Sequence, residues 1–92
     1  MGKSVYSNDY KIFLARLRSA RMQAGLTQED LAKRLGQTQS FVSKCERGER
    51  RLDVVELKRV CDAIGLSLAE FIEGLVLDLE SDAFVRNREF ET

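Results

Sequence analysis

Residues 26–52, LTQEDLAKRLGQTQSFVSKCERGERRL, contain two short amphipathic segments separated by a Gly-Gln-Thr tripeptide. A threonine precedes each segment, Thr27 the first and Thr38 the second, and offers a side-chain oxygen to the unpaired N–H groups of a first helical turn. The glycine of the tripeptide is suited to the left-handed conformation that ends a helix. The pattern predicts helices over 28–35 and 39–47, joined as a helix-turn-helix.

The second of these helices has two different faces. At about 100° per residue, Val42 and Cys45 share one side, which we expect to be buried. The opposite side has hydroxyls, amides and cations but no acid. Glutamine pairs with an adenine edge, lysine donates to guanine acceptors, and serine serves either base. We therefore predict that the residues reading base edges in the major groove are Gln39, Ser40, Ser43 and Lys44. A solvated helix end without a partner is the alternative.

Two apolar residues of this helix each allow two interpretations. Phe41 either stacks on a sugar-phosphate or thymine methyl group, or packs against the helix over 28–35. Cys45 is either a plain core side chain or a redox-sensitive thiol. The second cysteine of the chain, Cys61, also lies on an apolar face, so we expect both to be reduced core thiols.

The rest of the chain repeats the same pattern of polar starts, apolar residues at three- and four-residue spacing, and glycine stops. It predicts three more helices, over 9–24, 54–64 and 68–74. The expected starts are Asn8 or Asp9, Asp53 and Ser67, and the expected stops are Gly25, Gly65 and Gly74. No stretch shows sustained strand-like alternation, so the predicted fold is all-α with five helices.

The run from Leu26 to Leu52 resembles the helix-turn-helix of the Cro and phage-repressor type, the XRE family of bacterial transcriptional regulators. The matching features are the Leu-Thr-Gln opening, Leu31-Ala32, the turn glycine, Val42-Ser43 and the Glu46-Arg-Gly motif. The resemblance extends more loosely from about residue 10 to residue 72. It implies a compact lambda-repressor-like domain that binds double-stranded DNA, commonly as a repressor.

The resemblance also implies roles for individual residues. It aligns Gln28 with a phosphate contact at the start of the first helix of the motif, and Arg21 with Glu46 as a structural ion pair. Arginines that follow the recognition helix correspond to backbone contacts, and the N–H groups at helix starts suit phosphate oxygens. The expected phosphate-binding residues are Gln28, Thr38, Arg47, Arg50 and Arg51.

Charge is unevenly distributed along a chain whose formal net charge is zero. Residues 10–52 contain ten basic and four acidic residues, a net charge of +6, whereas residues 53–92 contain four basic and ten acidic residues, a net charge of −6. Such asymmetry favours a polyanionic partner for the basic half. The chain has no histidine, and no nucleophile-and-base arrangement is visible, so we expect no catalytic residues, no metal and no cofactor.

The expected organisation is an N-terminal arm over 1–8, the DNA-binding domain over 9–74 and an extension over 75–92. The extension is acidic but has seven large apolar residues, Leu75, Val76, Leu77, Leu79, Phe84, Val85 and Phe90. It either packs across the two-fold axis of a homodimer or folds back on its own domain. We expect a cytoplasmic protein without a membrane segment, bound to an inverted-repeat operator. A protein-interaction module, or an antitoxin-type partner whose DNA binding is secondary, is the alternative function.

Overall fold

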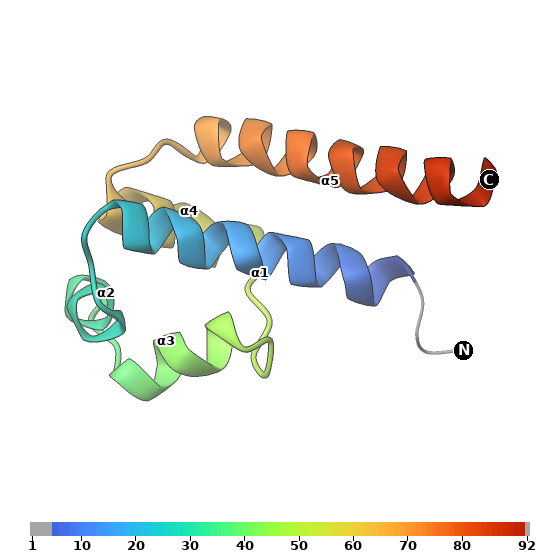
Figure 1. Ribbon diagram of the computed structural model, residues 1–92. Coiled ribbons are helices and arrows are strands. Elements are labelled where there is room, and N and C mark those ends of the chain that lie inside the picture. The colour runs from blue at the N-terminus through green and yellow to red at the C-terminus, as the bar shows by residue number, and fades with distance from the viewer. Residues whose placement is uncertain (1–4, 92) are drawn as a thin grey trace.

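A computed structural model describes the backbone of residues 5–91 and the side chains of residues 8–82. This part of the chain forms five α-helices and no strand, which confirms the predicted all-α fold (Figure 1). The helices are α1 (Val5–Gln23), α2 (Gln28–Leu35), α3 (Gln39–Glu46), α4 (Val54–Ile64) and α5 (Leu68–Glu91). None of the described helices is long and apolar enough to cross a membrane.

The helix-turn-helix forms where local signals place it. Thr27 caps α2, accepting from the Asp30 N–H, while the Asp30 carboxylate accepts from the Thr27 N–H. Gly36 ends α2 with φ +67°, a left-handed conformation that a side chain would strain. Thr38 caps α3 by accepting from the Phe41 N–H. Predicted and observed bounds agree for α2 and α4, and α3 ends one residue earlier than expected.

The hydrophobic core lies where all five helices meet. Its buried residues come from the apolar faces that the spacing predicts, and Cys61 and Phe71 are the most completely enclosed. The core cluster comprises Leu17, Leu31, Ala32, Val42, Leu57, Val60, Cys61 and Phe71. Cys45 is also buried, and both cysteines are free thiols. Because α3 supplies Val42 and Cys45 to the interior, its opposite face is turned outward.

The predicted outer ends of the first and last helices are wrong. Helix α1 begins at Val5, so Asn8 lies within it and donates from Nδ2 to Asp82 Oδ2 of α5, 3.1 Å away. Helix α5 continues through Gly74, the expected stop. A Cβ at Gly74 would lie 2.6 Å from Arg16 Cζ, so the glycine provides room for a side chain of α1.

The expected domain borders therefore fall inside helices. Of the expected arm, residues 5–8 belong to α1, and residues 1–4 lie outside the described residues. The start of the extension continues α5 and folds back on its own domain, where Arg16 Nε contacts Asp78 Oδ2 at 2.6 Å. Helices α1 and α5 run antiparallel and extend together beyond α2–α4 (Figure 1). The side chains of Phe84, Val85 and Phe90 lie outside the described part.

Candidate nucleic-acid interface

The outward face of α3 contains the predicted base-reading side chains. Val42 and Cys45 are only 3% and 4% exposed, which fixes the rotation of the helix about its axis. On the other side the structure places Gln39, Ser40 and Lys44 in solvent and Ser43 half-buried. The one acid of α3, Glu46, points away from this face into an ion pair. The face thus presents hydrogen-bonding groups and a cation, as base recognition requires.

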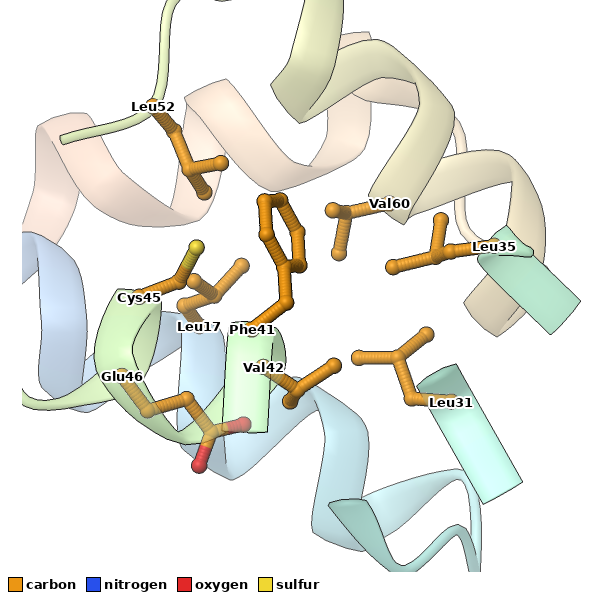
Figure 2. A pocket seen from close by; sticks show the side chains of 9 residues that line it. All are labelled: Leu17, Leu31, Leu35, Phe41, Val42, Cys45, Glu46, Leu52 and Val60. Carbon is orange, nitrogen blue, oxygen red and sulfur yellow. The ribbon is translucent and has the colours of Figure 1, made fainter. Parts of the chain in front are cut away.

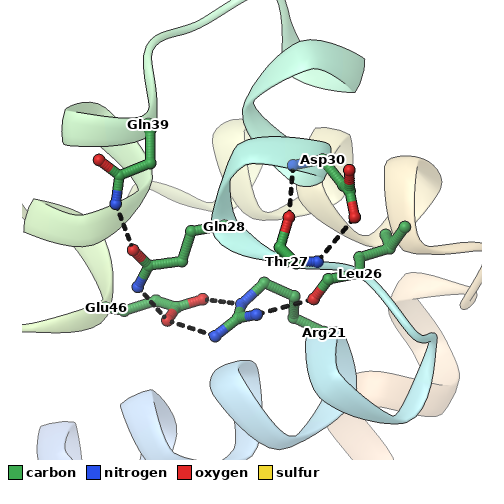
Figure 3. A network of polar contacts seen from close by, with 7 residues as sticks. All are labelled: Arg21, Leu26, Thr27, Gln28, Asp30, Gln39 and Glu46. Atoms are coloured by element: carbon green, nitrogen blue, oxygen red, sulfur yellow. Dashed lines mark hydrogen bonds and ion pairs between the residues drawn. The ribbon is translucent and has the colours of Figure 1, made fainter.

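Glu46 and Arg21 form a nearly enclosed ion pair (Figure 3). Their side chains are 5% and 8% exposed, and Arg21 Nε and Nη2 bond to the two carboxylate oxygens at 2.6 and 3.1 Å. Arg21 Nη1 donates to the Leu26 carbonyl oxygen at 2.7 Å. Two charges buried with these bonds are mutually compensated. The pair joins the end of α3 to α1 and to the turn before α2.

Two glutamines extend this network to the surface of α3 (Figure 3). Gln28 Nε2 donates to Glu46 Oε1 at 2.9 Å, and Gln28 Oε1 accepts from Gln39 Nε2 at 2.6 Å. A predicted phosphate contact and a predicted base reader are therefore bonded to each other. Both stand at the first position of their helices, where unpaired N–H groups face outward. The network orients both amides before any partner arrives.

Three exposed arginines follow α3, and we call them the rim arginines: Arg47, Arg50 and Arg51. Each of them contacts other groups of the protein. Arg47 donates to both carboxylate oxygens of Glu49, at 3.0 and 3.2 Å, and to Ser43 Oγ. Its guanidinium lowers the pKa of the Glu49 carboxyl through these bonds. Arg51 lies over the Tyr10 ring, with Cζ 4.2 Å from the ring centroid. The guanidinium groups of Arg47 and Arg51 are thus held in defined positions.

Arg50 has two partners that the sequence reasoning did not foresee. Its guanidinium lies over the Phe41 ring, 4.8 Å from the centroid, and bonds to both carboxylate oxygens of Glu56. Glu56 was missed because it belongs to the next helix. The Asp53-Val-Val-Glu56 spacing, typical of a capping box, is the signal that could have drawn attention to it.

A small cavity lies beneath α3 (Figure 2). Phe41 lines it together with Leu35, Leu52 and Val60, so packing against the domain is the interpretation that the structure supports for this ring. The space is about 10 Å³, enough for a single water molecule at most. Cys45 also borders it, and burial raises the pKa of this thiol, which disfavours the reactive thiolate.

Known proteins share this architecture. A sequence model described as Helix-turn-helix matches residues 17–71. An uncharacterized HTH-type transcriptional regulator, y4dJ, of Sinorhizobium fredii is 39% identical over 52 residues, 56% of this chain and 68% of that relative. A solved XRE-family like protein from Pseudomonas syringae pv. tomato is 44% identical, with a TM-score of 0.76, covering 82% of this chain and 92% of that one.

A second solved structure contains DNA. The restriction-modification controller protein C.Esp1396I, as a tetramer in complex with its natural 35 base-pair operator, is 26% identical to this chain. The TM-score is 0.68, and the match covers 74% of this chain and 90% of that one.

Proposed function

This chain belongs to the helix-turn-helix family of XRE type and is a DNA-binding transcriptional regulator, and we propose that it recognises an inverted-repeat operator through α3. The observation that carries the proposal is the outward face of α3. It contains Gln39, Ser40, Ser43 and Lys44, has no exposed acid, and is held by the enclosed Arg21–Glu46 pair.

In this proposal the four side chains enter the major groove and read base edges. Gln39 is the leading reader, because its bond to Gln28 fixes the amide in one orientation. An amide oriented in this way presents a donor and an acceptor together, the combination that an adenine edge matches. Ser40, Ser43 and Lys44 then contact neighbouring base pairs of the same half-site.

Phosphate contacts surround this face. The N-termini of α2 and α3, with Gln28 and Thr38, present N–H groups to one backbone strand. Arg47, Arg50 and Arg51 lie beyond the other end of α3 and approach the backbone there. These contacts add affinity for any duplex and make binding sensitive to salt. The protein acts by binding, without a catalytic step or a cofactor, in the cytoplasm, where bacterial DNA lies.

One short helix contacts too few base pairs for useful selectivity, so we propose a symmetric dimer on two half-sites. The operator-bound relative C.Esp1396I is itself a tetramer. Here, Ile72 and Val76 lie one turn apart on α5 and are 38% and 43% exposed. Leu75, between them in the sequence, lines a shallow groove of about 440 Å³ together with Tyr10, Phe13, Val54 and Leu57 among others. A second copy covering this surface would remove it from water.

Selection from a randomised duplex library at near-physiological salt tests the proposal. We expect purified protein to enrich an inverted repeat whose half-sites lie about one helical turn apart. Retention of random sequence that is lost as salt rises would indicate electrostatic binding alone. Retention of nothing would overturn the proposal and favour a protein-interaction or antitoxin-type role.

A further inference from the structure

The loop between α3 and α4, residues 47–53, contains the three rim arginines, Arg47, Arg50 and Arg51, which are the proposed phosphate contacts. Arg50 lies at its centre and is held on several sides. The guanidinium stacks on Phe41, Nη2 donates to Glu56 Oε2 at 2.7 Å, and Nη1 donates to Glu56 Oε1 at 3.2 Å and to the Arg51 carbonyl at 3.1 Å. Such a planar fork matches a carboxylate in one geometry only.

Glu56 also belongs to the capping box at the start of the next helix, α4. Its Oε1 accepts from the Asp53 N–H at 3.0 Å, while its own N–H donates to Asp53 Oδ1 at 2.7 Å. The bonds from Arg50 and from the Asp53 backbone lower the pKa of the Glu56 carboxyl to about 2, so it is ionised at neutral pH. One carboxylate therefore links the loop after the recognition helix to the start of α4.

A helix cap alone does not require this arrangement. The Thr27–Asp30 box at α2 and the Ser67–Glu70 box at α5 have the same reciprocal bonds. Among the described residues, neither of those two carboxylates forms an ion pair with an arginine, whereas that of Glu56 does. The acid of the α4 capping box, Glu56, thus binds Arg50 in addition to capping the helix.

We propose that Glu56 is a positioning residue that favours the operator over arbitrary DNA by holding Arg50. The inference rests on the proposed function of α3. A negative charge beside the rim lowers attraction for every duplex alike. A loop that is already ordered, in contrast, loses less conformational freedom when it docks on one defined backbone path. The first effect weakens binding to random DNA, and the second restores binding at the operator.

The decisive variant is Glu56→Gln, and Asp62→Asn is its matched control. Asp62 lies on the same helix, its side chain is 57% exposed, and it pairs only with Lys58 among the described ion pairs, so its replacement changes net charge equally without touching the loop. Dissociation constants are measured for the duplex selected by the unmodified protein and for a random duplex of equal length. We expect Glu56→Gln to lower the operator-to-random ratio by about tenfold, with random binding unchanged or tighter, and Asp62→Asn to change it by less than about threefold.

A second variant guards against loss of folding in Glu56→Gln. Arg50→Lys keeps the charge and leaves the α4 cap intact, but a lysine cannot form the fork. We expect Arg50→Lys to lower the operator-to-random ratio as Glu56→Gln does. The double variant, with both substitutions, should have a ratio no lower than that of the less selective single variant.

Equal ratios for Glu56→Gln and Asp62→Asn, or an unchanged ratio for Arg50→Lys, would overturn the inference while leaving the proposed function intact. Failure of the unmodified protein to select any sequence would overturn both.

Discussion

Gln39 is the residue at which the internal hydrogen bonds of the domain reach the proposed DNA-binding face of α3. It donates to Gln28, which in turn donates to Glu46. Gln39→Ala removes the proposed base contact and leaves the Gln28–Glu46 hydrogen bond in place. We expect operator affinity to fall by about 1–3 kcal/mol and selectivity to relax at one base position. Competition titrations against single-base operator variants measure both, and equal loss for random DNA would contradict the assignment.

The Arg21–Glu46 pair makes a different prediction, because both side chains are almost enclosed. Arg21→Met leaves the Glu46 carboxylate without its partner in a site from which water is largely excluded. We expect the free energy of unfolding to fall by about 3–5 kcal/mol in urea titrations. Arg21→Met combined with Glu46→Leu removes both charges, so it should lose less than the single variant. If the double variant is less stable than Arg21→Met alone, this expectation is wrong.

Glu56 links stability to pH. Its pKa is about 2 in the folded protein, below the ordinary value of 4.5. A lowered folded pKa stabilises the native state above the unfolded pKa, and this contribution disappears as pH falls from about 4.5 toward 2. We expect Glu56→Gln to lose less stability than the unmodified protein over this interval in thermal unfolding experiments. If the stability of both proteins falls by the same amount between pH 4.5 and pH 2, the Glu56 carboxylate does not form the described bonds to Arg50 and Asp53.

At the scale of helices, local signals proved sufficient where the capping residues interact with their own helix. Thr27, Thr38 and Asp53 cap α2, α3 and α4 at the expected positions because each bonds within its first turn. In the sequence, Asn8 resembles a helix start and Gly74 resembles a helix stop, but both lie within helices and take part in contacts between α1 and α5. Their partners are more than fifty residues away, so no local pattern could have revealed their use.

The predicted site shows the same limit. The rotation of α3 follows from its own apolar residues, so the residues of its outward face could be listed from the sequence. The partners of the rim arginines could not, because Tyr10 and Glu56 belong to other helices. Spacing along one helix reports which side is exposed, but it does not report what a long side chain reaches.

Gly74 gives a test at this scale. Gly74→Ala should gain about 0.5–1 kcal/mol from helix propensity, but its methyl group displaces the Arg16 guanidinium from Asp78. That ion pair is about a third exposed and contributes about 0–1 kcal/mol. We expect a net change within about 1 kcal/mol of zero in urea titrations. In an Arg16→Ala background the same substitution should stabilise by the full propensity term, and destabilisation there would point to a backbone clash.

Across the whole molecule, the charge asymmetry of the sequence becomes a spatial one. The basic half contains the helix-turn-helix, and α5, which belongs to the acidic half, lies on the far side of the domain from α3 (Figure 1). Within residues 8–82, whose side chains the structure describes, the ion pairs Arg16–Asp78 and Arg50–Glu56 join the halves. An acidic helix facing away from the duplex avoids repulsion by phosphate and remains available to a second protein surface.

The dimer prediction belongs to this scale, since it concerns a surface of α5, on the far side of the domain from α3 (Figure 1). Val76→Lys places a charge on the exposed apolar side of α5, and Leu77→Lys makes the same change about 100° around the helix, at a residue 66% exposed. We expect Val76→Lys to halve the sedimentation mass and to weaken inverted-repeat binding by at least about tenfold, because the two half-sites are then bound independently.

Affinity for a duplex with one half-site should stay unchanged in Val76→Lys, since α3 is untouched. Leu77→Lys should behave as the unmodified protein in both assays. If Leu77→Lys dissociates the dimer and Val76→Lys does not, the subunits meet on the Leu77 side of α5. If neither variant changes the mass of a dimeric protein, the subunits meet elsewhere and the groove beside Val54 is not their contact.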